Sequence, residues 1–256
     1  MTEITNRVIP ALLITSAAGL STTIGSILGL MPKRPGPRFL SGALGFSAGI
    51  MLMVSFLELL PQGIAKIGFG NAQLGFFGGI LAFFFVDYLV PHEFAGHVDH
   101  SPQIDNRRMY RTGLLLAVGI GIHNFPEGIA TFFGSLVDMR LGLAIAVAIA
   151  LHNIPEGLAV SIPIYAATGS RRKAFIWSFL SGVAEPVGAI LSILFLYHFM
   201  TPALLGWLLV VAAGIMVFVC IDELSPISCS LGEEHIPILT VILGMAVMAL
   251  SLGLLK

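Results

Sequence analysis

Charged residues are scarce in this chain. Only 11% of the 256 residues are charged and 56% are hydrophobic, which gives a mean hydropathy of +0.94. Soluble domains carry about 25% charged residues, so the composition excludes an ordinary soluble protein and indicates an integral membrane protein. The formal net charge of −1 provides no excess of positive charge for a nucleic-acid partner.

Cysteine is almost absent as well. Cys220 and Cys229 are too few to form a disulfide framework, and we expect one buried thiol and one free loop thiol. The zincin phrase His-Glu-x-x-His is also missing. The first apolar run follows Arg7 and is closed by no small-residue cleavage site, which predicts a retained helix rather than a signal peptide.

Long apolar runs are what the chain does contain. A membrane-spanning helix needs about 20 apolar residues, and eight such runs can be marked. Their aliphatic composition without two-residue alternation favours helices over a barrel. We therefore predict an all-α membrane protein with one transmembrane domain over 1–256 and spans at about 8–30, 39–64, 73–90, 112–135, 141–166, 174–199, 203–224 and 236–255.

The basic residues predict the orientation of these spans. Nine of them lie in three alternate loops, and four are scattered singly on the other side: Lys33, Arg34, Arg38, Arg107, Arg108, Arg111, Arg171, Arg172 and Lys173 against Arg7, Lys66, Arg140 and Lys256. By the positive-inside rule, the three loops are cytoplasmic and both termini lie outside. The loop after the seventh span should also be cytoplasmic, yet it carries Glu233 and Glu234 without a Lys or Arg.

One polar phrase is written twice inside apolar runs, as His123-Asn124-Phe125-Pro126-Glu127-Gly128 and His152-Asn153-Ile154-Pro155-Glu156-Gly157. A single charge at the centre of a membrane helix costs about 2.5–3.5 kcal/mol, so the repetition indicates a function. His and Glu four residues apart share one helix face. Each proline leaves a carbonyl without its helical partner, and each glycine lets a neighbouring helix approach closely. Imidazole, carboxylate and amide oxygen suit zinc, iron(II), cobalt or manganese.

A second internal repeat relates spans two and seven. Ala48-Gly49-Ile50-Met51 is followed by Glu58-Leu59 and Pro61, and Ala213-Gly214-Ile215-Met216 is followed by Glu223-Leu224 and Pro226 at the same spacing. An odd number of crossings separates the two spans, so they must run in opposite directions. This pattern predicts an inverted repeat with a 3+2+3 plan, in which spans four and five lie between the two halves.

A third acidic position lies in span six, where Glu185 precedes Pro186. His123, Glu127, His152, Glu156 and Glu185 all fall near the middle of their spans. At about 1.5 Å per residue they can meet in one layer, which is where secondary transporters place their sites.

The doubled phrase, HNFPEG and HNIPEG, resembles the fourth and fifth membrane helices of the ZIP (Zrt/Irt-like) divalent-metal transporters, and is closest to their bacterial ZupT-type branch. The resemblance extends over nearly the whole chain. It implies a transporter of the bacterial inner membrane that moves zinc, and also iron(II), manganese, cobalt or cadmium, into the cytoplasm by alternating access. It further implies no enzymatic activity, no cofactor and a homodimer. The lipid bilayer and the transported cation are the expected partners.

The same resemblance assigns roles to particular side chains. It implies a first metal site made by His123, Glu127, His152 and Glu156. It implies a second, adjacent site in which Asn124, Asn153 and Glu185 join the two shared glutamates. Some family members carry Asp at the position of Asn153. Two other functions stay open from the residues alone: an intramembrane metalloenzyme, which would lack an obvious general base, and a metal efflux antiporter with the same ligands.

The remaining polar residues have lesser expected roles. We predict Glu58 to capture cations at the entrance, and Glu223 with Asp222 to receive them at the exit; the alternative is that these acids anchor helix ends before Pro61 and Pro226. The loop 91–110 holds His92, His97 and His100, and either binds metal loosely or is a solvated linker. Asp87 is either a helix-end carboxylate or a pathway residue, and His198 and His235 are expected at the interface.

Overall fold

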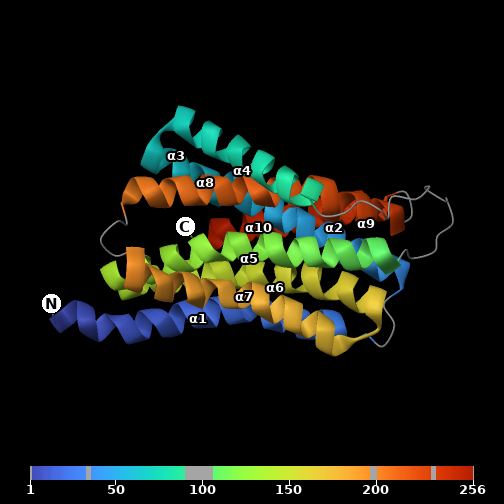
Figure 1. Ribbon diagram of the computed structural model, residues 1–256, viewed down its shortest axis with the longest axis horizontal. Helices are drawn as coiled ribbons and strands as arrows, with labels where there is room; N and C mark the ends of the chain where they lie inside the picture. Colours follow the sequence, from blue (N-terminus) through green and yellow to red (C-terminus); the bar gives the residue numbers. More distant parts are fainter. Residues whose placement is uncertain (1, 33–35, 90–105, 197–200, 232–234, 256) are drawn as a thin grey trace.

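The chain forms a bundle of long helices. The computed structural model describes residues 2–32, 36–89, 106–196, 201–231 and 235–255, and within these ranges every regular element is helical (Figure 1). The elements are α1 (Thr2–Leu30), α2 (Pro37–Val54), η1 (Ser55–Leu59), α3 (Leu60–Ile67), α4 (Phe69–Leu89), α5 (Asn106–Val137), α6 (Met139–Thr168), α7 (Arg171–Leu191), η2 (Ser192–Leu196), α8 (Pro202–Val219), η3 (Cys220–Leu224), α9 (Ser225–Leu231) and α10 (Ile236–Leu255).

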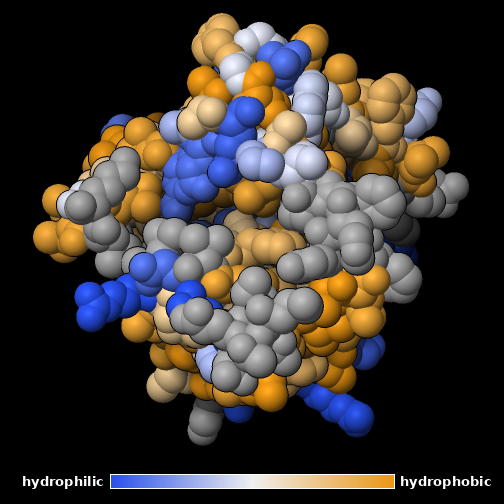
Figure 2. All heavy atoms as spheres, turned by 90° about the vertical axis from the view of Figure 1, so that its left-hand side faces the viewer, coloured by the Kyte–Doolittle hydropathy of each residue, from blue (hydrophilic) through white to orange (hydrophobic). Residues whose placement is uncertain are grey.

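Eight of the helical segments are long and apolar enough to cross a membrane, as the sequence predicts. Their flanks are rich in exposed apolar side chains; Leu254 on α10, for example, is 87% exposed. Figure 2 looks onto the end of the bundle nearest the N-terminus, where hydrophilic side chains gather in patches between hydrophobic ones. An apolar flank of this extent fits a lipid environment. The predicted all-α membrane fold is confirmed.

Two spans are longer than the sequence predicts. The second, predicted to end at about 64, continues to Ile67, and the seventh, predicted to end at about 224, continues past Pro226 to Leu231. In each, a five-residue π-helix precedes the proline, and a backbone N–H bonds the carbonyl five residues earlier: Leu60 to Ser55, and Ser225 to Cys220. The wider turn accommodates a residue that has no N–H and whose ring clashes with an ordinary helical carbonyl. The prolines therefore shift the helical hydrogen bonds without ending the helix.

The two repeat segments have matching secondary structure. α2 and α8 each contain 18 residues and begin with proline, and each leads into a five-residue π-helix, η1 or η3. The two segments run in opposite directions through the bundle (Figure 1). This agrees with the antiparallel relation expected from the sequence, whereas the complete 3+2+3 arrangement stays a prediction.

The helices pack in two groups. α1, α5, α6 and α7 contact one another extensively and form what we call the four-helix bundle (Figure 1). α2 packs on α10, α4 packs on α8, and the two groups meet where α2 contacts α6 and α8 contacts α5. Glycine residues allow the backbones of neighbouring helices to come into direct contact. A Cβ on Gly157 would lie 1.9 Å from the Thr22 carbonyl oxygen, so no larger residue fits between α1 and α6 at this point.

Candidate metal centre

The seven residues expected to bind metal lie on three neighbouring helices. α5 supplies His123, Asn124 and Glu127, α6 supplies His152, Asn153 and Glu156, and α7 supplies Glu185. All seven are at most 2% exposed, and each lies in the middle part of its membrane-spanning segment. Three helices thus bring three carboxylates into one buried region.

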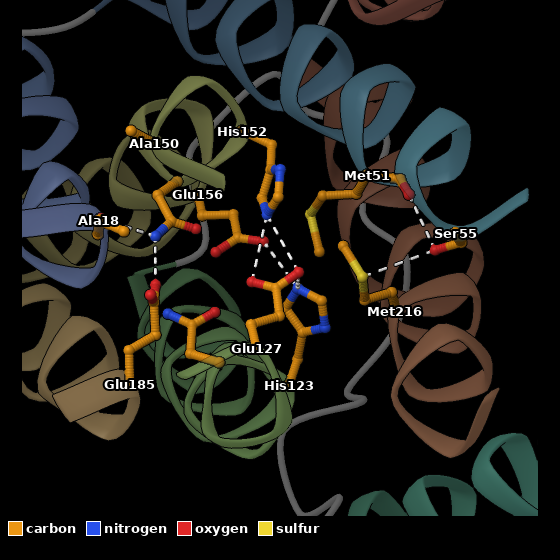
Figure 3. Close-up of polar contacts among 12 residues, drawn as sticks. Ala18, Met51, Ser55, His123, Glu127, Ala150, His152, Glu156, Glu185 and Met216 are labelled. Atoms are coloured by element: carbon orange, nitrogen blue, oxygen red, sulfur yellow. Dashed lines mark hydrogen bonds and ion pairs between the residues drawn. The ribbon is translucent and has the colours of Figure 1, made fainter. Parts of the chain in front are cut away.

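The histidines and glutamates of α5 and α6 are in direct contact, and we call these four residues the His–Glu core (Figure 3). His152 Nε2 lies 3.1 Å from Glu127 Oε1 and 3.2 Å from Oε2. His123 Nε2 lies 3.3 Å from Glu127 Oε1 and 3.4 Å from Glu156 Oε1. The Glu127 carboxylate therefore contacts both imidazoles. The two copies of the phrase, one on α5 and one on α6, are thus in direct contact through their His and Glu side chains.

Several polar atoms of the core are left for a ligand. Both carboxylate oxygens of Glu156 and Nδ1 of His123 and His152 have no hydrogen-bond partner among the described residues. Buried polar atoms are normally paired, and leaving one unpaired costs about 1–3 kcal/mol. His123, His152 and Glu156 each offer a ligand atom within 4.8 Å of the other two. A divalent cation would satisfy this set of donors.

The remaining three residues form a second part of the centre, which we call the Asn–Glu185 arm. Asn153 Nδ2 donates to Glu185 Oε1 and, at 3.0 Å, to the carbonyl of Ala18 on α1 (Figure 3). Asn124 Nδ2 donates at 3.2 Å to the Ser181 carbonyl on α7. The oxygens Asn124 Oδ1, Asn153 Oδ1 and Glu185 Oε2 have no partner in the described part of the chain. Each amide N–H group thus donates to a backbone carbonyl of a neighbouring helix, and each amide oxygen is left for a cation to bind.

The local sequence explains this placement. Gly128 lets α7 approach α5, since a Cβ there would lie 2.1 Å from the Glu185 carbonyl oxygen. Pro155 is followed directly by Glu156, and its carbonyl accepts a 2.9 Å hydrogen bond from the Ser47 hydroxyl of α2. The proline–glutamate–glycine order therefore contributes to packing as well as to metal binding. In the second copy, Glu156 directly follows a proline whose carbonyl is bonded to α2.

Two methionines at the centre were not singled out from the sequence. Met51 on α2 and Met216 on α8 are each 1% exposed, and their side chains lie between the His–Glu core and Ser55 (Figure 3). The Ser55 hydroxyl donates to the Met51 carbonyl at 2.8 Å and lies 3.6 Å from Met216 Sδ. Both methionines belong to the Ala-Gly-Ile-Met repeat, from which the sequence predicted an inverted repeat and two pathway acids but no role for the methionines. Their matching positions in that repeat were the available signal.

The acids of the expected pathway lie within helices and not at helix ends. Glu58 is half-buried in η1 and Glu223 is buried in η3, so each precedes about two further turns of helix. Both acids lie in the later half of their spans, Pro37–Ile67 and Pro202–Leu231, and their pathway roles stay a prediction. The alternative, in which they anchor helix ends before Pro61 and Pro226, does not fit because neither proline ends its helix.

Glu223 belongs to a cluster of charges that the sequence only partly predicts. Asp87, exposed Asp222 and Glu223 offer ligand atoms within 4.8 Å of one another. Arg111 donates to Asp87 and lies 3.7 Å from Glu223 Oε1, and the Thr112 hydroxyl donates to Glu223 Oε2. Asp87 is thus a buried ion-pair partner on α4, and Arg111 belongs to α5 and not to the preceding loop.

The other candidate residues add little to the centre. His235 is exposed, and Cys220 and Cys229 are free thiols, one buried and one exposed. His92, His97, His100, His198, Glu233 and Glu234 lie outside the described residues.

Eight apolar spans around a buried cluster of imidazoles and carboxylates define a class of multi-pass membrane protein with an internal cation centre. Comparison with known sequences identifies the family. The sequence model of the ZIP zinc transporters matches residues 95–252. The chain is 52% identical to the zinc transporter ZupT of Chlorobium phaeovibrioides over 98% of this chain and 99% of the relative. It is 46% identical to the proteins of that name from Akkermansia muciniphila (96% and 98%) and Streptococcus mutans (94% and 96%). The chain belongs to the ZIP family.

Proposed function

We propose that the protein transports divalent metal cations, zinc foremost, across the membrane and into the cytoplasm. The observation that carries the proposal is the His–Glu core: four ligand-type side chains at mid-span, almost fully buried, in which neither Glu156 carboxylate oxygen has a hydrogen-bond partner among the described residues. The relatives named above are zinc transporters, which supports zinc as the cargo. Iron(II), manganese, cobalt and cadmium are further candidates by the same ligand chemistry.

The two parts of the centre have different roles in this proposal. His123, Glu127, His152 and Glu156 hold one cation. The second position uses Asn124, Asn153 and Glu185 together with the carboxylates of Glu127 and Glu156. The division is supported by the contacts: the imidazoles touch Glu127, whereas Glu185 touches Asn153. Oxygen-rich ligation at the second position favours harder cations than the imidazole-containing first position.

The charge of the centre links metal binding to protons. Three buried glutamates bring a charge of −3 into a region where unpaired ions cost several kcal/mol each. One divalent cation leaves −1 and two leave +1, so neither occupancy is neutral by itself. A bound proton can supply the missing charge, so metal and proton occupancy of the centre are linked, and the affinity must be modest enough for release.

The orientation and the pathway are part of the same proposal. Both termini lie outside a bacterial inner membrane, the loop 91–110 is cytoplasmic, and spans one to three are mirrored by six to eight around spans four and five. Cations enter on the side of Glu58 and leave past Glu223 and Asp222 by alternating access. The cluster with Asp87 supports an acid-lined exit. A homodimer, which the family resemblance implies, stays a prediction.

Metal flux into proteoliposomes of controlled orientation tests the proposal. Uptake of zinc in one orientation, without release of a modified product, supports an importer. Flux in the reverse orientation that requires a counter-gradient would identify an efflux antiporter. Absence of flux together with a metal-dependent reaction would identify an intramembrane enzyme.

A further inference from the structure

Close packing contacts in this protein occur in pairs that are related by a constant shift along the chain. A Cβ on Gly49 would lie 2.1 Å from the Val241 carbonyl oxygen, and a Cβ on Gly214 would lie 2.0 Å from that of Phe76. A shift of 165 positions turns the first contact into the second, since it moves 49 to 214 and 76 to 241. α2 therefore packs on α10 in the way that α8 packs on α4.

The two helices of the doubled phrase show the same kind of relation. A Cβ on Gly128 of α5 would lie 2.1 Å from the Glu185 carbonyl oxygen on α7, and a Cβ on Gly157 of α6 would lie 1.9 Å from that of Thr22 on α1. The shift between the two glycines, from 128 to 157, is 29 positions. These paired contacts agree with the inverted repeat predicted from the sequence. In such a repeat, each residue of α4, η3 and α5 has a counterpart at the opposite end of the molecule.

One end carries polar contacts that cross between the two helix groups. Arg111 on α5 donates to Asp87 on α4 and lies 3.7 Å from Glu223 Oε1 in η3. The Thr112 hydroxyl donates to the other oxygen of Glu223, Oε2. We call these four residues the Arg111 latch. Asp87, Thr112 and Glu223 are all buried, so the latch joins the four-helix bundle to α4 and η3 largely out of contact with solvent.

The sequence does not repeat this latch at the opposite end. The counterpart positions, shifted by 165 (87 to 252, 223 to 58) or by 29 (111 to 140, 112 to 141), hold Leu252, Glu58, Arg140 and Leu141. One leucine thus stands at the place of the carboxylate that Arg111 bonds, and another stands at the place of the hydroxyl that bonds Glu223. The two counterpart acids also differ in exposure, because Glu58 is half-buried whereas Glu223 is 4% exposed.

The two ends should therefore differ in how firmly the helix groups are joined. Hydrogen bonds between charged groups are about twice as strong as those between neutral groups. Separating a buried ion pair is also costly, because it leaves each charge desolvated and without its partner. Apolar contacts are non-directional, so leucines at the counterpart positions do not fix one arrangement of the helices.

We propose that the Arg111 latch holds the molecule closed at the end where α5 begins, and that the opposite end, which lacks an equivalent, opens first. α5 begins at the end of the molecule opposite the N-terminus (Figure 1). The two helix groups meet where α2 contacts α6 and α8 contacts α5, beside the His–Glu core. Separation of the groups at either end would therefore open the core towards that side.

The latch also links this opening to the cargo, and this part rests on the proposed function. A cation that leaves past Glu223 competes with Arg111 and Thr112 for the same carboxylate. Its arrival would release the contacts that join α5 to α4 and η3. Without cargo, the centre would face the side of Glu58 and be ready to accept a cation.

Distances between spin labels test the latch in the purified full-length protein without added metal. One labelled pair spans the latch end between α4 and α5, and the other spans the opposite end between α10 and α6. All four labelled positions are exposed: Leu89→Cys with Asn106→Cys, and Leu254→Cys with Leu143→Cys. Exposed Cys229 is first replaced by serine, whereas Cys220 is buried and is retained.

Arg111→Gln should add a second, longer distance to the Leu89–Asn106 pair and should not lengthen the other pair. The matched control is Arg140→Gln, which removes the counterpart arginine and should leave the Leu89–Asn106 distance as in the parent. The near-isosteric Thr112→Val removes only one hydrogen bond, and it carries the test if Arg111→Gln does not fold. Parent-like distances in both latch variants, or lengthening of both pairs, would overturn the proposal.

Added zinc tests the link to the cargo separately. Zinc should lengthen the Leu89–Asn106 distance in the parent, as Arg111→Gln does without metal. An unchanged distance in a protein that takes up zinc into proteoliposomes would show that cargo passes without opening the latch, and would overturn this link. The comparison without metal requires no flux, so the latch and the proposed transport can fail independently.

Discussion

Glu127 is the acid whose replacement should affect the protein most. Its carboxylate lies 3.1 Å from His152 and 3.3 Å from His123, so Glu127→Gln keeps the shape and removes one charge that both imidazoles and the proposed cation share. Two unit charges 4 Å apart interact by about 4 kcal/mol at an effective dielectric constant of about 20, and a divalent cation by about twice that. If desolvation offsets half, about 4 kcal/mol is lost, which is about a thousandfold in affinity.

Uptake of radioactive zinc into proteoliposomes measures this effect. Glu127→Gln and Glu127→Ala should both abolish uptake, while the protein still inserts and elutes as the parent does. Asp138→Asn is the matched control, because it also removes one carboxylate, but from an exposed position between α5 and α6. Normal uptake by Glu127→Gln at matched membrane abundance would refute the assignment of the His–Glu core as the transport site.

Further substitutions test other parts of the proposal. Glu156→Ala should abolish zinc uptake as Glu127→Ala does, and parent-like rates at equal abundance would remove it from the centre. Asn153→Asp places a second carboxylate against Glu185 and should tighten metal binding and slow release; an unchanged metal rank order and turnover would show that Asn153 is not a ligand. Glu58→Gln should mainly raise the apparent KM for external zinc, whereas Glu223→Gln should mainly lower the maximal rate; equal, small effects would make both residues structural. Gly157→Ala should lower the unfolding temperature, since overpacking costs about 1–3 kcal/mol, and a melting curve like the parent's would contradict the close α1–α6 contact.

The sequence by itself predicted the membrane fold and the composition of the centre. The eight apolar runs can be recognised as helices from the sequence alone. In lipid the backbone N–H and C=O groups must bond one another, and a single helix achieves this without a partner. The doubled His-Asn-x-Pro-Glu-Gly phrase stood out for a similar reason. A polar group inside such a run is costly on its own, so its presence indicates a use before any contact is known.

The tertiary structure decided what lies next to the phrase. Met51 and Met216 are unremarkable apolar residues in their own helices, and only the packing of α2 and α8 on α6 and α5 brings them beside the His–Glu core. The lengths of spans two and seven were also decided at this level. A proline ends a helix or is absorbed by a π-turn according to whether the surrounding helices hold the chain in line, and local sequence does not specify which.

The pairing of Arg111 with Asp87 has the same origin. An arginine at the start of a membrane span is typical of a loop that follows the positive-inside rule, and nothing in its neighbours predicts a partner 24 residues earlier on α4. Residue types and their spacings can be read directly from the sequence. The partner of a polar atom cannot, because it depends on which other helices pack around that atom.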